Sequence, residues 1–292
     1  MISRPATESA GQQPGEQLPA DGEEQLLLPG LAPSLAELVP RSGEGLALSA
    51  TAIELYRICP LKYKFARVLA IRRRQTTNQR FGILIHQVLE RFHAEQMGLG
   101  VDAPPASGEG DLQRLLELFD AGWERSGFRS SDEDLRLREL AVQALRRYHE
   151  RQSASEASPV WLERGFEFAI GPHRVRGRVD RVDRLPDGEH ELIDYKTGRP
   201  KAQEELIDDV QLPLYRLGAR EDWGIEAKLQ SYYYVLEDVK VPLVSSEEDT
   251  QRVERTVLEV AAGIEALDFE PKPSPEVCGW CDFRTSCPAA AA

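Results

Sequence analysis

The chain has 292 residues, of which 41% are hydrophobic, and it carries a formal net charge of -13 at pH 7. This balance excludes a protein coated in basic surface, so any contact with nucleic acid must be confined to local positive patches. No apolar run reaches eighteen residues and the N-terminus lacks the pattern of a secretory signal, so we expect a cytoplasmic protein without a membrane span.

The first half of the chain predicts an arm followed by helices. Residues 1–45 are rich in Pro, Gly, Ala, Ser and Glu, which indicates a disordered arm or linker. Ser49 or Thr51 can cap a first helix that runs to Ile58, and Pro60 can start a second one. Apolar residues at helical spacing predict three longer helices, over 80–97, 111–125 and 132–151, with a loop over 98–110.

The second half predicts a sheet with helices around it. Asp209 can cap a helix that reaches Arg220, with Pro213 near its tolerated first turn. Alternating residues and turn signals predict strands over 160–170, 174–185, 190–197 and 228–236, and a long helix is expected over 247–267. The expected domains are an arm at 1–45 and one domain at 46–292, with a helical part at about 50–155, a catalytic α/β core at about 158–245, and a C-terminal helix and Cys-rich tail at 247–288.

One local positive patch is visible between Thr51 and Arg80, where eight basic residues stand against the single acid Glu54. A solvated helix and loop would carry such a short charge run without any ligand. Aromatic residues lie among the charges, an arrangement typical of a surface that contacts a nucleic-acid backbone and stacks bases. The candidate DNA-binding residues are Tyr56, Lys62, Lys64, Arg67, Arg72, Arg73 and Arg74.

The segment 178–196 carries the chemistry. A turn signal at 186–188 separates two strand-like halves, and a three-residue loop with a left-handed glycine is a common hairpin closure. Counting outward from that loop places Asp180 directly opposite Asp194 on one face of the sheet. Asp183 is a competing acid, but its parity places it on the opposite face.

Two directly opposed carboxylates lie about 4.5–5.5 Å apart at Cβ and repel each other. A divalent cation would compensate, and hard oxygen ligands suit Mg²⁺ or Mn²⁺. Lys196 follows Asp194 by two residues on the same face, where it could orient or help deprotonate water, or neutralise charge on a phosphate. The alternative is an exposed hairpin with ordinary charges.

In their order along the chain these residues resemble the PD-(D/E)xK nuclease superfamily and, within it, the RecB-type nuclease domain. The resemblance covers residues 48–288 and implies an α/β fold, with a restriction-endonuclease-like core of a central mixed sheet flanked by helices, an N-terminal helical region and a C-terminal iron–sulfur staple. It rests on Gly177-Arg-Val-Asp180, Ile193-Asp-Tyr-Lys196-Thr-Gly198, Gln211-x-x-x-Tyr215, Gly82-x-x-x-His86 and four cysteines.

The same resemblance implies roles for single residues. It implies that Asp180, Asp194 and His86 bind metal and that Lys196 is catalytic, although a lone histidine beside an apolar helix stripe is commonly structural. Glu90, one turn after His86, could hold its ring. Two further expectations concern residues beside the site: Gln211 and Tyr215 project from one helical face as catalytic or supporting residues, and Glu163 resembles a recurrent acid of these domains.

All four cysteines of the chain belong to one candidate set of metal ligands. Cys278, Cys281 and Cys287 are close in sequence, and Cys59 lies far upstream. Disulfides are disfavoured in a cytoplasmic chain, so four thiolates suggest either tetrahedral zinc or a 4Fe–4S cluster, which spacing alone does not separate. The resemblance extends to AddB-type and CRISPR-adaptation nucleases and implies a structural cluster that ties the ends of the chain together, with Trp280 and Phe283 packed around it.

The sequence therefore predicts an Mg²⁺- or Mn²⁺-dependent deoxyribonuclease, a single-stranded DNA exonuclease of DNA repair or recombination. The resemblance implies a superfamily-1 helicase partner, and because the chain has no phosphate-binding Walker loop, such a motor must be a separate chain or a missing part. Two rival hypotheses are a CRISPR-adaptation nuclease and a non-catalytic iron–sulfur DNA-binding clamp. Intact Asp180, Asp194 and Lys196 count against the clamp.

Overall fold

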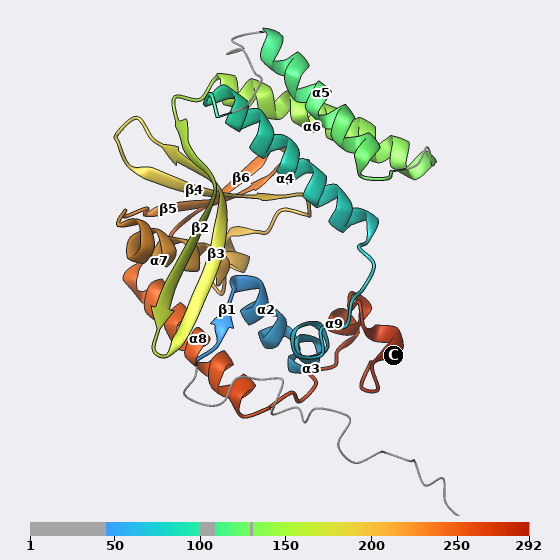
Figure 1. Cartoon of the computed structure of the whole chain (residues 1–292), viewed down its shortest axis with the longest axis vertical. Helices are drawn as coiled ribbons and strands as arrows, with labels where there is room; N and C mark the ends of the chain where they lie inside the picture. The colour runs from blue at the N-terminus through green and yellow to red at the C-terminus, as the bar shows by residue number, and fades with distance from the viewer. Residues whose placement is uncertain (1–44, 100–108, 129–130, 292) are drawn as a thin grey trace, which may run out of the picture. The chain divides into compact units, whose positions relative to one another are not determined.

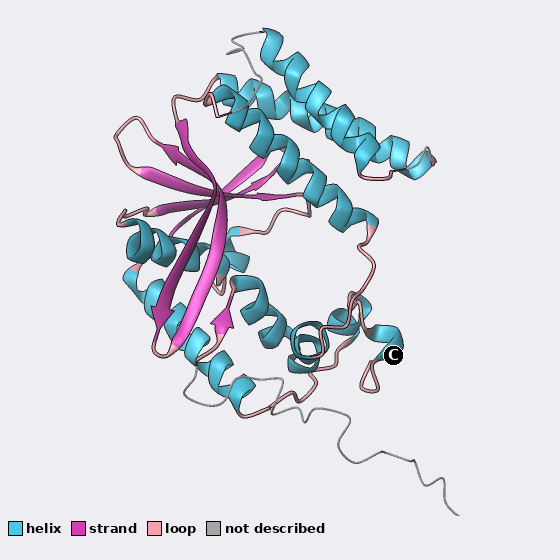
Figure 2. Cartoon of the chain, viewed as in Figure 1, coloured by secondary structure: helices cyan, strands magenta, loops and turns pink. Residues whose placement is uncertain are grey.

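A computed structural model describes residues 45–99, 109–128 and 131–291 of the chain (Figure 1). The arm predicted at 1–45 lies outside these residues except for its last position. The described residues form an α/β fold in which a mixed six-stranded sheet has helices on both faces (Figure 2). Among the helices of these segments, none combines the length and apolar character that crossing a membrane requires.

The sheet is built around a long hairpin of β2 (Ser158–Ile170) and β3 (His173–Arg184). Strand β4 (His190–Lys196) pairs antiparallel with β3, β5 (Leu229–Tyr234) runs parallel to β4, and the short β1 (Ala47–Leu48) runs parallel to the start of β3. The edge strand β6 (Val239–Val244) is antiparallel to β5. Strand β6 was not predicted from the sequence, because Pro242 interrupts its pattern; within a sheet, proline is tolerated at such an edge.

Helices cover the two faces of the sheet in separate groups. One hydrophobic core joins the sheet to α2 (Ala50–Ile58), α7 (Gln211–Trp223) and α8 (Glu247–Glu265), and the other joins it to α4 (Thr77–Gln96), α5 (Glu109–Arg125) and α6 (Asp132–Ser153). Alternate strand residues enter different cores: Leu192 faces the α7 side and Ile193 the α4 side. The short segments are α3 (Pro60–Tyr63), η1 (Lys64–Val68), η2 (Gln203–Leu206), α9 (Pro275–Gly279) and η3 (Arg284–Ser286).

Helix starts follow local capping. The Ser49 side chain accepts the Ala52 N–H and caps α2, as predicted. Helix α4 begins at Thr77, three residues before the predicted start, because Thr76 and Gln79 form a capping box. Helix α7 begins at Gln211, after the predicted cap at Asp209, but the Asp209 carboxylate still accepts a backbone N–H of its first turn.

Strand β3 has a gap along one edge. Its other edge pairs with β2 along the whole strand. On the gapped edge β3 pairs with β1 at Arg174 and Val175, and with β4 only from Arg181 onward. Residues 176–180 therefore have no strand partner there in the described part of the chain. We call this segment the β3 gap.

Candidate active site

The β3–β4 hairpin sets the register of the two central acids. A hydrogen bond from the Leu185 N–H to the Glu189 carbonyl (2.8 Å) closes its three-residue turn, and the pairs of the ladder keep this register. Continued by one residue beyond the last pair, the register aligns Asp180 with Asp194, as predicted. Asp183 faces the opposite side of the sheet, also as predicted, because alternate residues of a strand point to opposite faces.

The ladder ends before it reaches the two acids. Its last pair is Arg181 with Ile193, so Asp180 and Asp194 do not form the direct cross-strand pair that the sequence predicted. Instead, Asp180 Oδ2 accepts a hydrogen bond from the backbone N–H of Tyr195 (2.7 Å). The carboxylate takes the place of a ladder partner and holds Asp180 against β4.

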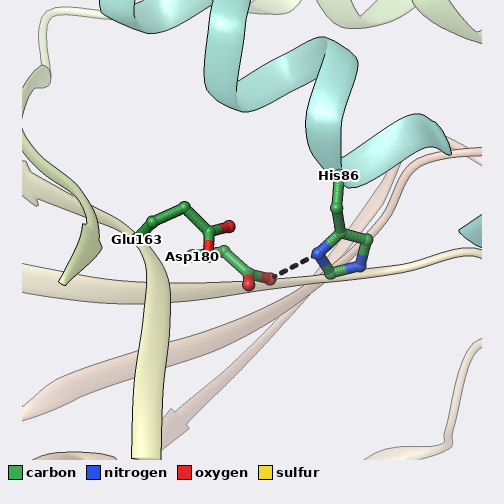
Figure 3. A group of neighbouring side chains, drawn as sticks. All are labelled: His86, Glu163 and Asp180. Atoms are coloured by element: carbon green, nitrogen blue, oxygen red, sulfur yellow. Dashed lines mark ion pairs between the residues drawn. The ribbon is translucent and has the colours of Figure 1, made fainter. Parts of the chain in front are cut away.

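Asp180 belongs to a compact group of three side chains (Figure 3). One ligand atom each of His86, Glu163 and Asp180 lies within 4.8 Å of the others, and His86 Nδ1 is 3.2 Å from Asp180 Oδ2. One imidazole and two carboxylates are donors that divalent cations accept. The predicted metal set had Asp194 where the structure has Glu163, which the sequence analysis considered only as support.

Glu163 reaches this group through a strained backbone. Pairing of β2 with β3 on both sides of Glu163 aligns it with Asp180. Its φ of 46° lies in the left-handed region that non-glycine residues rarely adopt, and such strain concentrates at functional sites. Burial and then the charge of Asp180 raise the pKa of Glu163 to about 7, although the Arg178 guanidinium lies only 3.1 Å away.

The His86 ring is held by Asp180. Burial lowers the pKa of the imidazole, but the hydrogen bond and charge of Asp180 outweigh burial, and the net pKa is raised. The ring also packs edge-on against Tyr195, with centroids 6.0 Å apart. Glu90 is exposed and makes no contact with the ring among the described interactions, so the prediction that Glu90 holds it is wrong.

Asp194 lies next to this group with its side chain almost fully buried, and the residue is 3% exposed. Its Oδ1 accepts from Gln211 Nε2 (2.6 Å) and from the Tyr215 hydroxyl (2.8 Å), so the two α7 residues meet at the carboxylate. Its Oδ2 lies 2.6 Å from Lys196 Nζ and forms an ion pair with it. Burial raises the pKa of Asp194, and Lys196 offsets part of the rise.

Lys196 has two further partners besides Asp194. Its Nζ donates to Gln211 Oε1 (3.0 Å) and lies 4.8 Å from the centroid of the Tyr232 ring. Burial lowers the pKa of Lys196, but Asp194 and the neighbouring acids outweigh burial, and the net pKa is raised. Lys196 is therefore an ammonium at neutral pH, suited to neutralising negative charge and not to taking a proton from water.

Two glycines bring α7 close to the sheet. The Phe166 ring of β2 lies between Gly177 of β3 and Gly218 of α7, where a Cβ on either glycine would come within 2.4 Å of a ring atom. Because the ring leaves no room for a side chain at either position, the helix approaches closely and presents Gln211 and Tyr215 to the sheet.

A buried network on the far face of the sheet escaped the sequence analysis. Arg181 and Asp183, each 1% exposed, form an ion pair. The guanidinium also donates to the Tyr148 hydroxyl (2.9 Å), which lies 2.7 Å from the Tyr195 hydroxyl. Because the Tyr195 N–H binds Asp180, this network fixes the strand that orients the acid. A charged residue two positions from another on a strand does not reveal in sequence that both are buried.

Two further acids lie near Lys201, and one of them, Glu54, also raises the pKa of Lys196. Asp209 is buried and accepts hydrogen bonds from Lys201 Nζ (3.0 Å) and the Tyr232 hydroxyl (2.9 Å). Burial and then the charge of Asp209 raise the pKa of Glu54, which comes from α2. From the sequence, Asp209 was expected only as a helix cap and Glu54 only as the lone acid of a basic segment. No sequence pattern indicates that Glu54 lies here.

The four cysteines, Cys59, Cys278, Cys281 and Cys287, line one pocket. Phe65 and Phe283 line the same pocket. All four belong to the described segments, and no three of their Sγ atoms lie within 4.8 Å of one another. A tetrahedral zinc site with Zn–S bonds of about 2.3 Å separates its sulfurs by only about 3.8 Å. The arrangement is therefore wider than a closed zinc site.

Two predicted aromatic positions are wrong. Tyr56 is 8% exposed and its hydroxyl donates to the Asp268 carbonyl (2.6 Å), so its ring is not available to stack on a base. Trp280 does not pack around the cysteines: it is 88% exposed, whereas Phe283 is buried.

The predicted basic residues differ in exposure. Arg67, Arg72, Arg73 and Arg74 are exposed, whereas Lys62 and Lys64 are half-buried. The Arg73 guanidinium lies 5.0 Å from the centroid of the Phe283 ring and joins the basic segment to the Cys-rich tail.

Comparisons with known proteins identify similar chains. The chain is 27% identical over 267 residues to the Gene 69 protein of Mycobacterium phage D29, covering 82% of this chain and 96% of that protein. The Gene 69 protein of Mycobacterium phage L5 is 34% identical over 133 residues, 44% of each protein. A solved structure from Eubacterium rectale aligns over 95% of this chain and 96% of its own, with 9% identity and a TM-score of 0.44. The sequence model of the PD-(D/E)XK nuclease superfamily matches residues 47–288, and the chain belongs to that superfamily.

Proposed function

We propose that this protein is a cytoplasmic, Mg²⁺- or Mn²⁺-dependent deoxyribonuclease that degrades single-stranded DNA as an exonuclease, working in repair or recombination beside a separate helicase. The observation that carries the proposal is the convergence of His86, Glu163, Asp180 and Asp194, which we call the acidic centre, next to the ammonium of Lys196. Membership of the nuclease superfamily supports the same chemistry.

The acidic centre fits a divalent cation on two counts. Glu163 and Asp180 are aligned carboxylates whose mutual repulsion a cation would relieve. Burial raises the pKa of the Asp194 carboxyl, and Lys196, 2.6 Å from its Oδ2, offsets only part of the rise, so a cation would stabilise the ionised carboxylate further. His86, Asp180 and Asp194, with Glu163 beside them, would hold one or two Mg²⁺ or Mn²⁺ ions, which supply a nucleophilic water and polarise the scissile phosphate.

The residues around the acidic centre prepare it for a phosphate. Gln211 and Tyr215 fix the Asp194 carboxylate, and Gln211 also fixes Lys196. The raised pKa of Lys196 keeps it positive, so that it neutralises the charge that grows on the phosphate during displacement. The chain thus offers carboxylates to a cation and one ammonium to the substrate.

We assign the four cysteines to a 4Fe–4S cluster, with zinc as the alternative, as the resemblance to AddB-type nucleases implies. They line one pocket, as a shared ligand requires. Anaerobically purified protein should be brown, with broad absorbance near roughly 400 nm; colourless protein with stoichiometric zinc would overturn the assignment.

A cleavage assay tests the nuclease proposal. End-labelled single-stranded DNA is incubated with Mg²⁺, Mn²⁺ or EDTA and either the native protein or Asp194→Ala. We expect the DNA to be shortened from one end only when metal is present. The rate should be more than about 100-fold lower in the variant, a larger loss than is typical for a residue that only hydrogen-bonds to a metal ligand. Asp187→Ala is the matched control, because Asp187 lies in the exposed hairpin turn. Equal activity in the native protein and Asp194→Ala would refute the proposal.

A further inference from the structure

The β3 gap opens beside the acidic centre. Residues 176–180 have no strand partner between β1 and β4 in the described structure, and a groove of about 410 Å³ lies there. The start of α2, Arg176 and Arg178 of β3, and Gln211 and Tyr215 of α7 line it. Because Gln211 and Tyr215 also hold Asp194, the groove leads directly into the acidic centre.

The groove carries positive charge where the protein as a whole is acidic. Arg176 and Arg178 are exposed and share one face of β3 with Asp180, since residues two apart point the same way. Arg178 is oriented by its ion pair with Glu163 (3.1 Å), whereas Arg176 has no ion-pair partner among the described residues. The exposed Thr51 lies on the opposite wall and adds a hydroxyl donor. Guanidinium groups bind phosphates through paired hydrogen bonds.

The spacing along β3 gives these arginines an order. Every second residue of a strand lies about 6.7 Å further along it. Arg178 is therefore one such interval from Asp180, and Arg176 is two. Successive phosphates of an extended nucleic-acid strand repeat on the same scale. We propose that the groove binds the substrate backbone next to the cleavage point, with Arg178 on the first flanking phosphate and Arg176 on the second. This inference rests on the proposed nuclease function.

A binding experiment without catalysis tests the groove by itself. A fluorescein-labelled single-stranded oligonucleotide is titrated with protein in EDTA, where no cleavage occurs, at several salt concentrations. Arg176→Ala should weaken binding about 3–10-fold and reduce the slope of log affinity against log salt by about 0.7, the value for one lost phosphate contact on a single strand. Arg176→Lys should keep most of the slope. The control is Arg184→Ala, an exposed arginine of β3 outside the groove.

Cleavage kinetics locate the contact. Arg176→Ala should raise KM about 3–10-fold and leave kcat within about twofold, because its phosphate is not the one that reacts. A substrate with a neutral methylphosphonate two phosphates from the cleavage point, on the side of the groove, should bind the native protein more weakly than the unmodified substrate does. Its affinity for Arg176→Ala should not change. An unchanged slope and KM in Arg176→Ala, or an equal change in Arg184→Ala, would overturn the groove. Salt-dependent binding by a native protein that does not cleave would instead overturn the nuclease proposal and leave the groove standing.

Discussion

The acidic centre and the four cysteines both gather metal-binding types of side chain, but the fold holds them differently. In the acidic centre, hydrogen bonds from Tyr195, Gln211 and Tyr215 hold the carboxylates, and three ligand atoms are already within 4.8 Å of one another. The cysteines come from the two ends of the domain and share a pocket, but their sulfurs are more widely spaced.

This difference predicts different consequences of removing the metal. The acidic centre is built from strand register and side-chain hydrogen bonds, so the protein should keep its geometry without a cation. The cysteine site joins Cys59 to the tail across roughly 220 residues, so its ligand should act as a cross-link that stabilises the fold. On the proposed assignments, the acidic centre is prepared before it binds an ion, whereas the cysteine site needs its cluster to hold the two ends of the domain together.

The largest expected effect is the loss of the cross-link. Cys59→Ser removes the only upstream ligand, and releasing a loop of roughly 220 residues costs about 5 kcal/mol, or about 10–20 °C in Tm. Calorimetry of anaerobically purified protein measures this loss. In protein stripped of iron by chelation the same variant should match the native chain, and an equal loss with and without iron would show that the thiol matters only through packing.

A slightly smaller loss is expected beneath the acidic centre, and it should not depend on metal. Asp183→Ala leaves the buried Arg181 guanidinium without its carboxylate, which costs about 3–5 kcal/mol. Denaturant unfolding in EDTA and in Mg²⁺ should give the same loss. A loss confined to one of the two conditions would contradict the prepared centre.

A smaller effect is expected in the pH dependence of stability of the metal-free protein. Its sign should be opposite to that produced by a typical ion-paired acid, whose pKa is lowered by folding. The raised pKa values of Glu163 (about 7), His86 and Asp194 mean that the folded state binds more protons than the unfolded state. Unfolding then releases protons, so Tm should fall as pH rises from about 4.5 to 7, and further as His86 titrates above about 6.5.

In EDTA, Glu163→Gln should reduce the fall of Tm with rising pH by a few degrees. In the native protein, Mg²⁺ should make Tm rise with pH instead, because the ion requires ionised carboxylates. Scanning fluorimetry across pH measures both. Glu189→Gln removes an exposed acid of the hairpin and serves as the control; a native Tm that rises with pH in EDTA would argue against the burial of these charges.

The smallest effect is expected at Trp280. Because its side chain is 88% exposed, Trp280→Ala should change stability by less than about 0.5 kcal/mol and leave the iron content unchanged. Phe283→Ala, at a buried ring beside the cysteines, should cost several times more. Iron loss in Trp280→Ala would restore the original prediction that the tryptophan packs around the ligand.

Local pattern was enough to predict much of this molecule. The turn at 186–188 determined the β3–β4 register that aligns Asp180 with Asp194, and an i, i+4 spacing placed Gln211 and Tyr215 on one helical face. Both inferences depend only on the geometry of one element or one hairpin.

Features that depend on tertiary packing were not predictable in this way. Glu163 reaches Asp180 only because its backbone adopts a left-handed conformation in β2, and the burial of Arg181 depends on α6 covering the sheet. The burial of Tyr56 could have been predicted, because Ala52, Ile53 and Tyr56 recur at helical spacing and form the buried stripe of α2. The charges between them suggested a surface residue instead.

Manganese binding tests the central claim, a prepared cation site at the acidic centre, most directly. Titrating Mn²⁺ into metal-free protein and following the free ion by electron paramagnetic resonance should show saturable binding, weakened more than about 10-fold in Asp180→Asn and in Asp194→Asn but not in Asp187→Asn. A native protein that binds no Mn²⁺, or an Asp180→Asn variant that binds it equally well, would contradict the account.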